Sequence, residues 1–147
     1  MNSAAILRSV DAVMIPVPDL DQGLSFYRDR LGHALVWRND AAGQAGLRLP
    51  GSDTELVLTT TLDAAVNWLV ASVDDAVDAV VRAGGFVVVA AAAIPVGRLA
   101  VVHDPFGNPL VLLDLSTGRY ITDADGQVVG VEPAADPNQR NATEDSA

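Results

Sequence analysis

The sequence predicts an α+β domain made of two copies of one βαβββ unit: a strand, a helix and three more strands. Apolar runs at strand spacing alternate with two stretches at helical spacing, in the same order in each half of the chain. Matching positions in the two halves are 56 residues apart, since Val17 falls on Val73 and Glu55 on Val111. An offset that holds at both ends of a unit indicates an internal duplication.

The first unit opens with an apolar strand over residues 11–17. Asp19 is expected to cap a helix, with Gln22 three residues later as in a capping box. Apolar residues then recur at helical spacing as far as Leu31, and Gly32 is expected to end the helix. Three short strands are predicted to follow, over residues 34–38, 46–49 and 55–60.

The second unit repeats this order. Its first strand is expected over residues 66–73, and a helix from Asp74 or Asp75 is expected to end at Gly84. Proline presets one turn residue and glycine tolerates positive φ, so the Asp-Pro-Phe-Gly-Asn run at residues 104–108 predicts a hairpin turn. The three further strands are predicted over residues 86–89, 98–103 and 109–115.

The paired units are expected within residues 1–119, at about 10–60 and 66–118. An Asp-Gly turn between two β-prone runs predicts a short appended hairpin over residues 120–131. Residues 132–147 are rich in Pro, Asn, Asp and Glu, and this composition predicts a disordered acidic tail.

Composition excludes several classes of function. The chain has no cysteine, which excludes disulfides, thiolate catalysis and zinc-thiolate sites, and no lysine, which excludes Schiff-base chemistry. A formal net charge of −10 argues against nucleic-acid and anionic-membrane partners. No apolar run is long enough to span a membrane, and the N-terminus does not look like a secretory signal, so we expect a cytoplasmic protein.

Two stretches carry a family resemblance. The run VMIPVPDLDQGLSFYRDRLG, residues 13–32, resembles the opening of the vicinal oxygen chelate superfamily, which includes glyoxalase I, bleomycin resistance proteins and extradiol dioxygenases. The runs VDDAVDAVVRAGG, residues 73–85, and GRLAVVHDPFGNPLVLLDL, residues 97–115, are similar to the second module of that superfamily. The resemblance covers residues 10–118 and implies that the curved sheets of two βαβββ modules together enclose a cavity.

The resemblance also bears on metal binding. Metal-dependent members of the superfamily place ligands on the first and last strands of each module, typically His or Gln paired with Glu. The corresponding positions here are Ala12, Glu55, Trp68 and Val111, of which only Glu55 could bind a metal. One carboxylate facing three carbon side chains does not hold a divalent ion, so we expect neither a metal nor another cofactor.

Strand alternation predicts which side chains line the cavity. Leu56 and Leu58 are expected to pack on the first helix, so strand alternation directs Glu55 and Val57 toward the cavity. The alternative is that Glu55 is an exposed acid near a strand start. The resulting lining is largely apolar and suits a hydrophobic or aromatic small molecule. The expected ligand-binding residues are Ala12, Met14, Glu55, Val57, Trp68, Val70, Val101, His103 and Val111.

Two of these residues are candidates for acid–base catalysis, Glu55 and His103. An inward-facing His103 could act as a general base, whereas the alternative is a turn histidine tied to the neighbouring carboxylates. Three arginines on predicted strands, Arg38, Arg48 and Arg98, could meet an anionic group of a ligand.

Two functional hypotheses remain open. The first is a metal-free small-molecule-binding protein of the glyoxalase/bleomycin-resistance type; the resemblance implies that it is a homodimer. The second is a glyoxalase/dioxygenase-like enzyme, a metal-independent lyase or isomerase that uses Glu55 or His103 as acid or base. Whether the protein is an enzyme is left open by the sequence.

Overall fold

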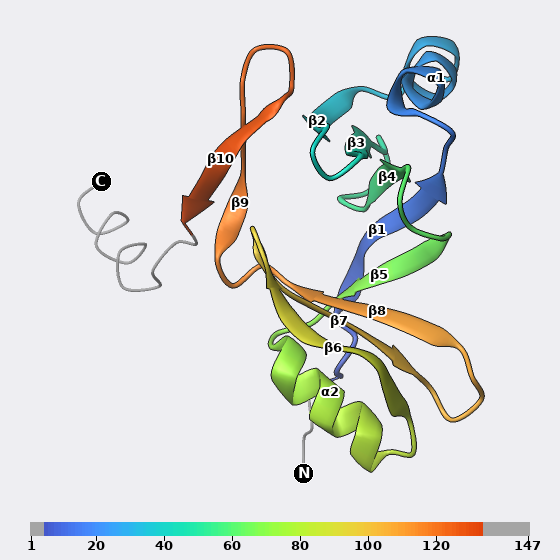
Figure 1. Ribbon diagram of the computed structural model, residues 1–147, viewed down its shortest axis with the longest axis vertical. Coiled ribbons are helices and arrows are strands. Elements are labelled where there is room, and N and C mark those ends of the chain that lie inside the picture. Colours follow the sequence, from blue (N-terminus) through green and yellow to red (C-terminus); the bar gives the residue numbers. More distant parts are fainter. Residues whose placement is uncertain (1–4, 134–147) are drawn as a thin grey trace.

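The structure, a computed structural model, describes residues 5–133 and confirms the α+β class with two βαβββ modules (Figure 1). Within this part of the chain, eight strands form one sheet in the order β2-β3-β4-β1-β5-β8-β7-β6, and β9 and β10 form a separate hairpin. The strands are β1 (Ser9–Pro16), β2 (Leu35–Asn39), β3 (Gln44–Arg48), β4 (Glu55–Thr59), β5 (Ala65–Leu69), β6 (Phe86–Ile94), β7 (Gly97–His103), β8 (Pro109–Asp114), β9 (Gly118–Thr122) and β10 (Val128–Pro133). The helical elements are α1 (Leu20–Leu24), its π-helical continuation η1 (Ser25–Arg30) and α2 (Val73–Arg82).

The two modules join through their first strands. In each module the first strand runs parallel to the last, β1 with β4 and β5 with β8, whereas β1 and β5 pair antiparallel. One continuous sheet therefore forms within a single chain. In Figure 1, α1 lies beside the first-module strands and α2 beside β6 and β7.

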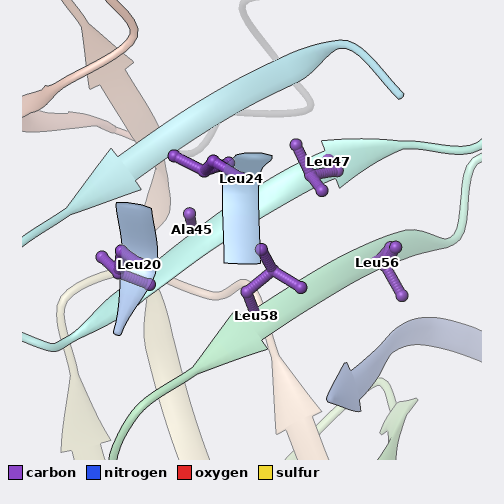
Figure 2. Close-up of a cluster of buried hydrophobic side chains, with 6 residues drawn as sticks. All are labelled: Leu20, Leu24, Ala45, Leu47, Leu56 and Leu58. Carbon is purple, nitrogen blue, oxygen red and sulfur yellow. The ribbon is translucent and has the colours of Figure 1, made fainter. Parts of the chain in front are cut away.

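The first helix begins and ends where the sequence predicts. The Asp19 carboxylate accepts the backbone N–H of Gln22 at 2.7 Å, and Gly32 has a positive φ of 86° just beyond the end of η1. Two leucines of α1 bury against the outer face of β3 and β4 (Figure 2). That cluster consists of Leu20, Leu24, Ala45, Leu47, Leu56 and Leu58.

The second helix begins earlier than predicted. Its N-cap is Ser72, whose hydroxyl accepts the backbone N–H of Asp75 at 3.3 Å, and β5 ends at Leu69 instead of residue 73. Three residues join the strand to the helix in each module, 17–19 in the first and 70–72 in the second, but the N-caps Asp19 and Ser72 are 53 residues apart instead of 56. The 56-residue offset consequently does not hold throughout β5, and the consequence for the cavity lining is described below.

The appended hairpin starts and ends outside its predicted bounds. It spans β9 and β10, so Glu132 and Pro133, which we expected in a disordered tail, belong to β10; the rest of that predicted tail, residues 134–147, lies outside the described residues. The backbone N–H of Arg38 donates to the carbonyl of Gly126 at 2.7 Å. The hairpin thus lies against the β2 edge of the large sheet (Figure 1).

None of the helices in residues 5–133 combines the length and the apolar character needed to cross a membrane.

Asp114 ties the second module together. It is 4% exposed, and its carboxylate accepts backbone N–H groups of Val73 at 2.9 Å, Arg98 at 3.1 Å and Ser116 at 3.2 Å, together with the Ser116 hydroxyl at 2.7 Å. Burial by itself would raise the pKa of Asp114, but these hydrogen bonds outweigh it and hold the pKa below its ordinary value of 3.8. The start of α2, β7 and the loop after β8 are therefore fixed by one carboxylate.

Replacing this carboxylate by an amide tests its structural role. Asp114→Asn puts an N–H₂ group where a carboxylate oxygen accepts backbone N–H groups, and we expect the free energy of unfolding at pH 7 to fall by about 3 kcal/mol. Because the pKa of Asp114 is lowered on folding, its contribution is present above about pH 4 and is lost as the pH falls through the folded-state value. Urea denaturation across this pH range measures both effects.

The matched control is Asp29→Asn, which makes the same chemical change at an exposed side chain. It is expected to change the free energy of unfolding by less than about 0.5 kcal/mol. Equal losses in the two variants, or an Asp114→Asn deficit that grows on acidification, would contradict the assigned role.

Candidate functional site

The inner face of the sheet borders a cavity of about 1510 Å³. Strands of both modules line it, and β9 of the appended hairpin contributes Arg119 and Tyr120. The Tyr120 ring packs on Trp37 of β2, with 5.2 Å between the ring centroids. Both modules and the hairpin that follows the second module therefore contribute to the lining.

One row of paired residues crosses the sheet at the level of Glu55, and every member lines the cavity. Directly paired residues on neighbouring strands point to the same face of a sheet. The row is polar at its first-module end and apolar at its second-module end. In order across the sheet it consists of Arg48, Glu55, Ala12, Asn67, Val111, Val101 and Val89.

Most of the expected lining residues lie where alternation placed them. Glu55 and Val57 point into the cavity, while Leu56 and Leu58 pack beneath α1. Glu55 is half-buried, so the alternative of an exposed acid near the strand start is not observed. Whether these residues bind a ligand stays a prediction. The expected residues that line the cavity are Ala12, Met14, Glu55, Val57, Val101 and Val111.

Three expected lining residues lie elsewhere, and for two of them the predicted face of β5 is wrong. Trp68 and Val70 pack in the cluster beneath α2, on the opposite face from the cavity. Asn67 takes the cavity position, because it pairs with both Ala12 and Val111. Asn67 therefore corresponds to Ala12, an offset of 55 residues instead of 56. A shift of one residue moves every side chain of a strand to the opposite face of the sheet.

His103 is the third. It is the last residue of β7, and its ring packs against Phe86 with 5.0 Å between centroids, outside the cavity lining. The prediction that it lines the cavity is therefore wrong. Its neighbour Asp104 instead organises the turn, accepting backbone N–H groups of Phe106 at 2.8 Å and Asn108 at 2.9 Å.

Of the three arginines that could meet an anionic ligand, only Arg48 lines the cavity. Arg38 forms ion pairs with Asp21 and Asp40 at 3.0 and 2.8 Å, and Arg98 forms one with Asp74 at 3.1 Å. These two side chains therefore take part in surface charge pairs.

Glu55 is a half-buried acid in the cavity wall. The indole N–H of Trp37 donates to its Oε1 at 2.9 Å. Burial raises the pKa of Glu55; the Trp37 hydrogen bond opposes this rise, nearby Asp11 adds to it, and Arg48 and Arg119 oppose it. The result is a half-buried carboxyl whose pKa lies above its ordinary value.

A glycine makes the Trp37 hydrogen bond possible. Trp37 is on β2 and Glu55 is on β4, so the indole must cross β3, where Gly46 is the residue paired with Trp37. A Cβ at Gly46 would overlap the indole nitrogen and its ring neighbours. The missing side chain therefore leaves the space through which Trp37 reaches Glu55.

Two functional candidates were not predicted from the sequence, Asp11 and Arg119. Alternation places Asp11 on the outer face next to inward Ala12, but β1 is irregular between Val10 and Ala12, and Asp11 lines the cavity. Bulges often re-aim side chains next to sites. Burial raises the pKa of Asp11, and the guanidinium of Arg119 partly offsets the rise. Strand periodicity contains no signal for either placement.

The residues at the family's metal positions do not fit a divalent ion. Ala12 and Val111 offer only carbon, so the donors at those positions are the carboxylate of Glu55 and the amide of Asn67. Arg119, close enough to lower the pKa of Glu55, adds positive charge beside them. Residues 5–133 hold no group of three or more His, Asp or Glu side chains arranged to bind a metal.

The Trp37 hydrogen bond can be tested through the pKa of Glu55. Trp37→Phe removes the indole N–H, which favours the ionised carboxylate, so we expect the pKa of Glu55 to rise further. Gly46→Ala is expected to raise it in the same direction, because the added methyl group displaces the indole. A ¹³C NMR titration of the Glu55 carboxyl measures its pKa in both variants.

Gly51→Ala is the control, since a Cβ there would meet nothing within 4 Å. It is expected to leave the titration of Glu55 unchanged. A Glu55 pKa that stays constant or falls in Trp37→Phe would show that the hydrogen bond does not stabilise the carboxylate.

Comparisons with known structures agree with this architecture. Methylmalonyl-CoA epimerase from Mycobacterium tuberculosis is 24% identical with a TM-score of 0.59, over 78% of this chain and 92% of that one. A glyoxalase/bleomycin resistance protein/dioxygenase superfamily member from Vibrio splendidus is 15% identical with a TM-score of 0.53, over 70% of this chain and 96% of that one. At these identities the likeness shows the fold alone.

No curated protein matches the sequence significantly. A sequence model of one family does match, over residues 9–112, which is most of the chain and includes both modules. The same residues form the continuous sheet and nearly all of the cavity wall. The chain therefore belongs to the Glyoxalase/Bleomycin resistance protein/Dioxygenase superfamily.

Proposed function

We propose that this protein binds a small, largely apolar or aromatic molecule in its cavity without a metal ion. The observation that carries the proposal is the composition of the cavity wall: the cavity has a volume of about 1510 Å³, and apart from Asn67 the second-module side of its wall is largely apolar. The apolar residues on that side are Val89, Leu99, Val101, Val111 and Leu113.

The size and chemistry of the cavity suit such a ligand. Small-molecule sites usually occupy about 300–1000 Å³, so this cavity has room for a ligand together with water. Burying about 200 Å² of apolar ligand surface contributes about 5 kcal/mol before the cost of association. The rings of Trp37 and Tyr120 add an aromatic surface beside the polar end.

A second candidate function is a metal-independent lyase or isomerase with Glu55 as acid or base. The observation that favours it is a half-buried carboxyl in the cavity wall whose pKa is raised by burial. A carboxyl of this kind can take a proton from a bound molecule and return it at another atom, which leaves the proton count unchanged. His103 is no longer a candidate, because it lies outside the cavity lining.

Binding and catalysis differ in what is recovered after incubation. A ligand found by thermal-shift screening of aromatic compounds is expected to raise Tm by about 8 °C at a hundred times its Kd. Under the binding proposal, mass spectrometry recovers it unchanged. A converted product whose formation falls about a hundredfold or more in Glu55→Gln would identify the enzyme instead.

Glu132→Gln, the same change on the hairpin outside the cavity lining, is the control and is expected to behave as the wild type. Glu55→Gln is expected to stay folded. Its neutral amide avoids the cost of a buried charge and still accepts the Trp37 N–H. A screen in which no aromatic compound shifts Tm would contradict the proposed binding function.

We further infer that the protein is a homodimer. The edge strand β6 contains no charged residue, and Phe86, Val87, Val88 and Val89 each expose between 43% and 50% of their surface. An exposed apolar edge usually needs protection or a partner, and a closed two-fold contact is the commonest assembly. A cytoplasmic location stays a prediction from the sequence.

Native mass spectrometry of protein purified without chelator tests the metal and assembly expectations in one measurement. We expect twice the chain mass of 15.3 kDa with no additional mass from a divalent ion. A monomer at micromolar concentration would contradict the homodimer. Near-stoichiometric zinc, manganese or iron would contradict the metal-free site.

A further inference from the structure

Six charged side chains line the cavity. Two of them, Asp53 and Asp63, lie on the loops before and after β4, and the other four lie around Glu55 without pairing with one another. Asp11 and Glu55 project from adjacent strands, Arg48 from β3, and Arg119 from the hairpin. Within residues 5–133, none of the four has an oppositely charged partner within the 4.0 Å that defines an ion pair. They nevertheless act on each other electrostatically, because Asp11 and both arginines influence the pKa of Glu55.

Asn67 is a second, independent sign that this end receives a polar group. Its side chain lines the cavity and the residue is only 9% exposed, so it is more than nine-tenths buried. In the described part of the chain no residue hydrogen-bonds to its amide. Its amide atoms are not among the fully buried side-chain N and O atoms of residues 5–133, so they are open to the cavity and can hydrogen-bond to a ligand that has donors and acceptors.

The row across the sheet sets the direction in which a ligand lies. Glu55 and Asn67 are two strands apart, about 10 Å, with the small side chain of Ala12 leaving space between them. Beyond Asn67 the row continues through Val111 and Val101, which offer no polar atoms. A bound molecule therefore meets polar groups at one end and carbon at the other.

We propose that the ligand carries a zwitterionic head, a protonated nitrogen and a carboxylate on neighbouring atoms as in an α-amino acid, attached to an apolar body. This rests on the proposed binding function and specifies its ligand class. The nitrogen lies toward Asp11 and Glu55, and the carboxylate lies toward Arg119 and Arg48, with the body over the apolar half of the row.

Ligands with a single charge fit less well. A simple amine would be attracted by the two carboxylates but repelled by the two arginines. A simple carboxylate would be attracted by the arginines but repelled by the carboxylates. A zwitterion pairs with both sets at once, and Asn67 can donate to its carboxylate or accept from its nitrogen. The recognition depends on Asp11 and Arg119, the two residues that the bulge and the hairpin bring into the cavity.

Three probes that share one aromatic body test the proposal: tryptophan, tryptamine and indole-3-propionate. Isothermal titration of the full chain is expected to give tryptophan a Kd at least tenfold below that of either singly charged probe. Equal affinities for the three would overturn the zwitterionic head while leaving the binding function in place. Binding by none of them at about 10 mM would overturn both.

Two variants test which side chain recognises each charge of the zwitterionic head. Asp11→Asn is expected to remove the advantage of tryptophan over indole-3-propionate while keeping its advantage over tryptamine. Arg119→Gln is expected to do the opposite. The matched control Asp29→Asn, at an exposed residue outside the cavity lining, is expected to keep both advantages. Equal effects of Asp11→Asn and Arg119→Gln on all three probes would overturn the assignment.

Discussion

The antiparallel pairing of β1 with β5 is the constraint on which the rest of this structure depends. It joins two modules that would otherwise be separate four-stranded sheets, and it places Ala12 between Glu55 on one side and Asn67 on the other. Because paired residues share a face, this contact decides which side chains of both modules meet in the cavity. The helices then cover the opposite face of each module.

The two modules have diverged in what they contribute to the site. The first provides most of the polar end, including Glu55 and the Trp37 that hydrogen-bonds to it, while the second provides Asn67 and a wall of valines and leucines. In the second module the position equivalent to Glu55 is Val111. Duplication therefore produced a symmetric scaffold around an asymmetric cavity, which suits a ligand with two chemically different ends.

The site is held at some cost in free energy. Glu55 and Asp11 are both carboxyls whose pKa burial raises, so their ionised forms are less stable here than in water. Asp114 is the contrasting case, because its hydrogen bonds outweigh burial and lower its pKa. One buried acid thus stabilises the fold, while the acids in the cavity are kept where a bound molecule can reach them.

The sequence by itself determined the duplicated βαβββ order, the inward direction of Glu55 and Val111, and the replacement of metal ligands by carbon at Ala12 and Val111. The first two features follow from strand periodicity and from the repeat, which can be found in the sequence itself, and the third follows from the family resemblance. Only the tertiary structure decided the cavity face of β5 and the arrival of Asp11 and Arg119. The pairing register of β5, a bulge and a distant hairpin set these positions, and each depends on which backbones pair in space.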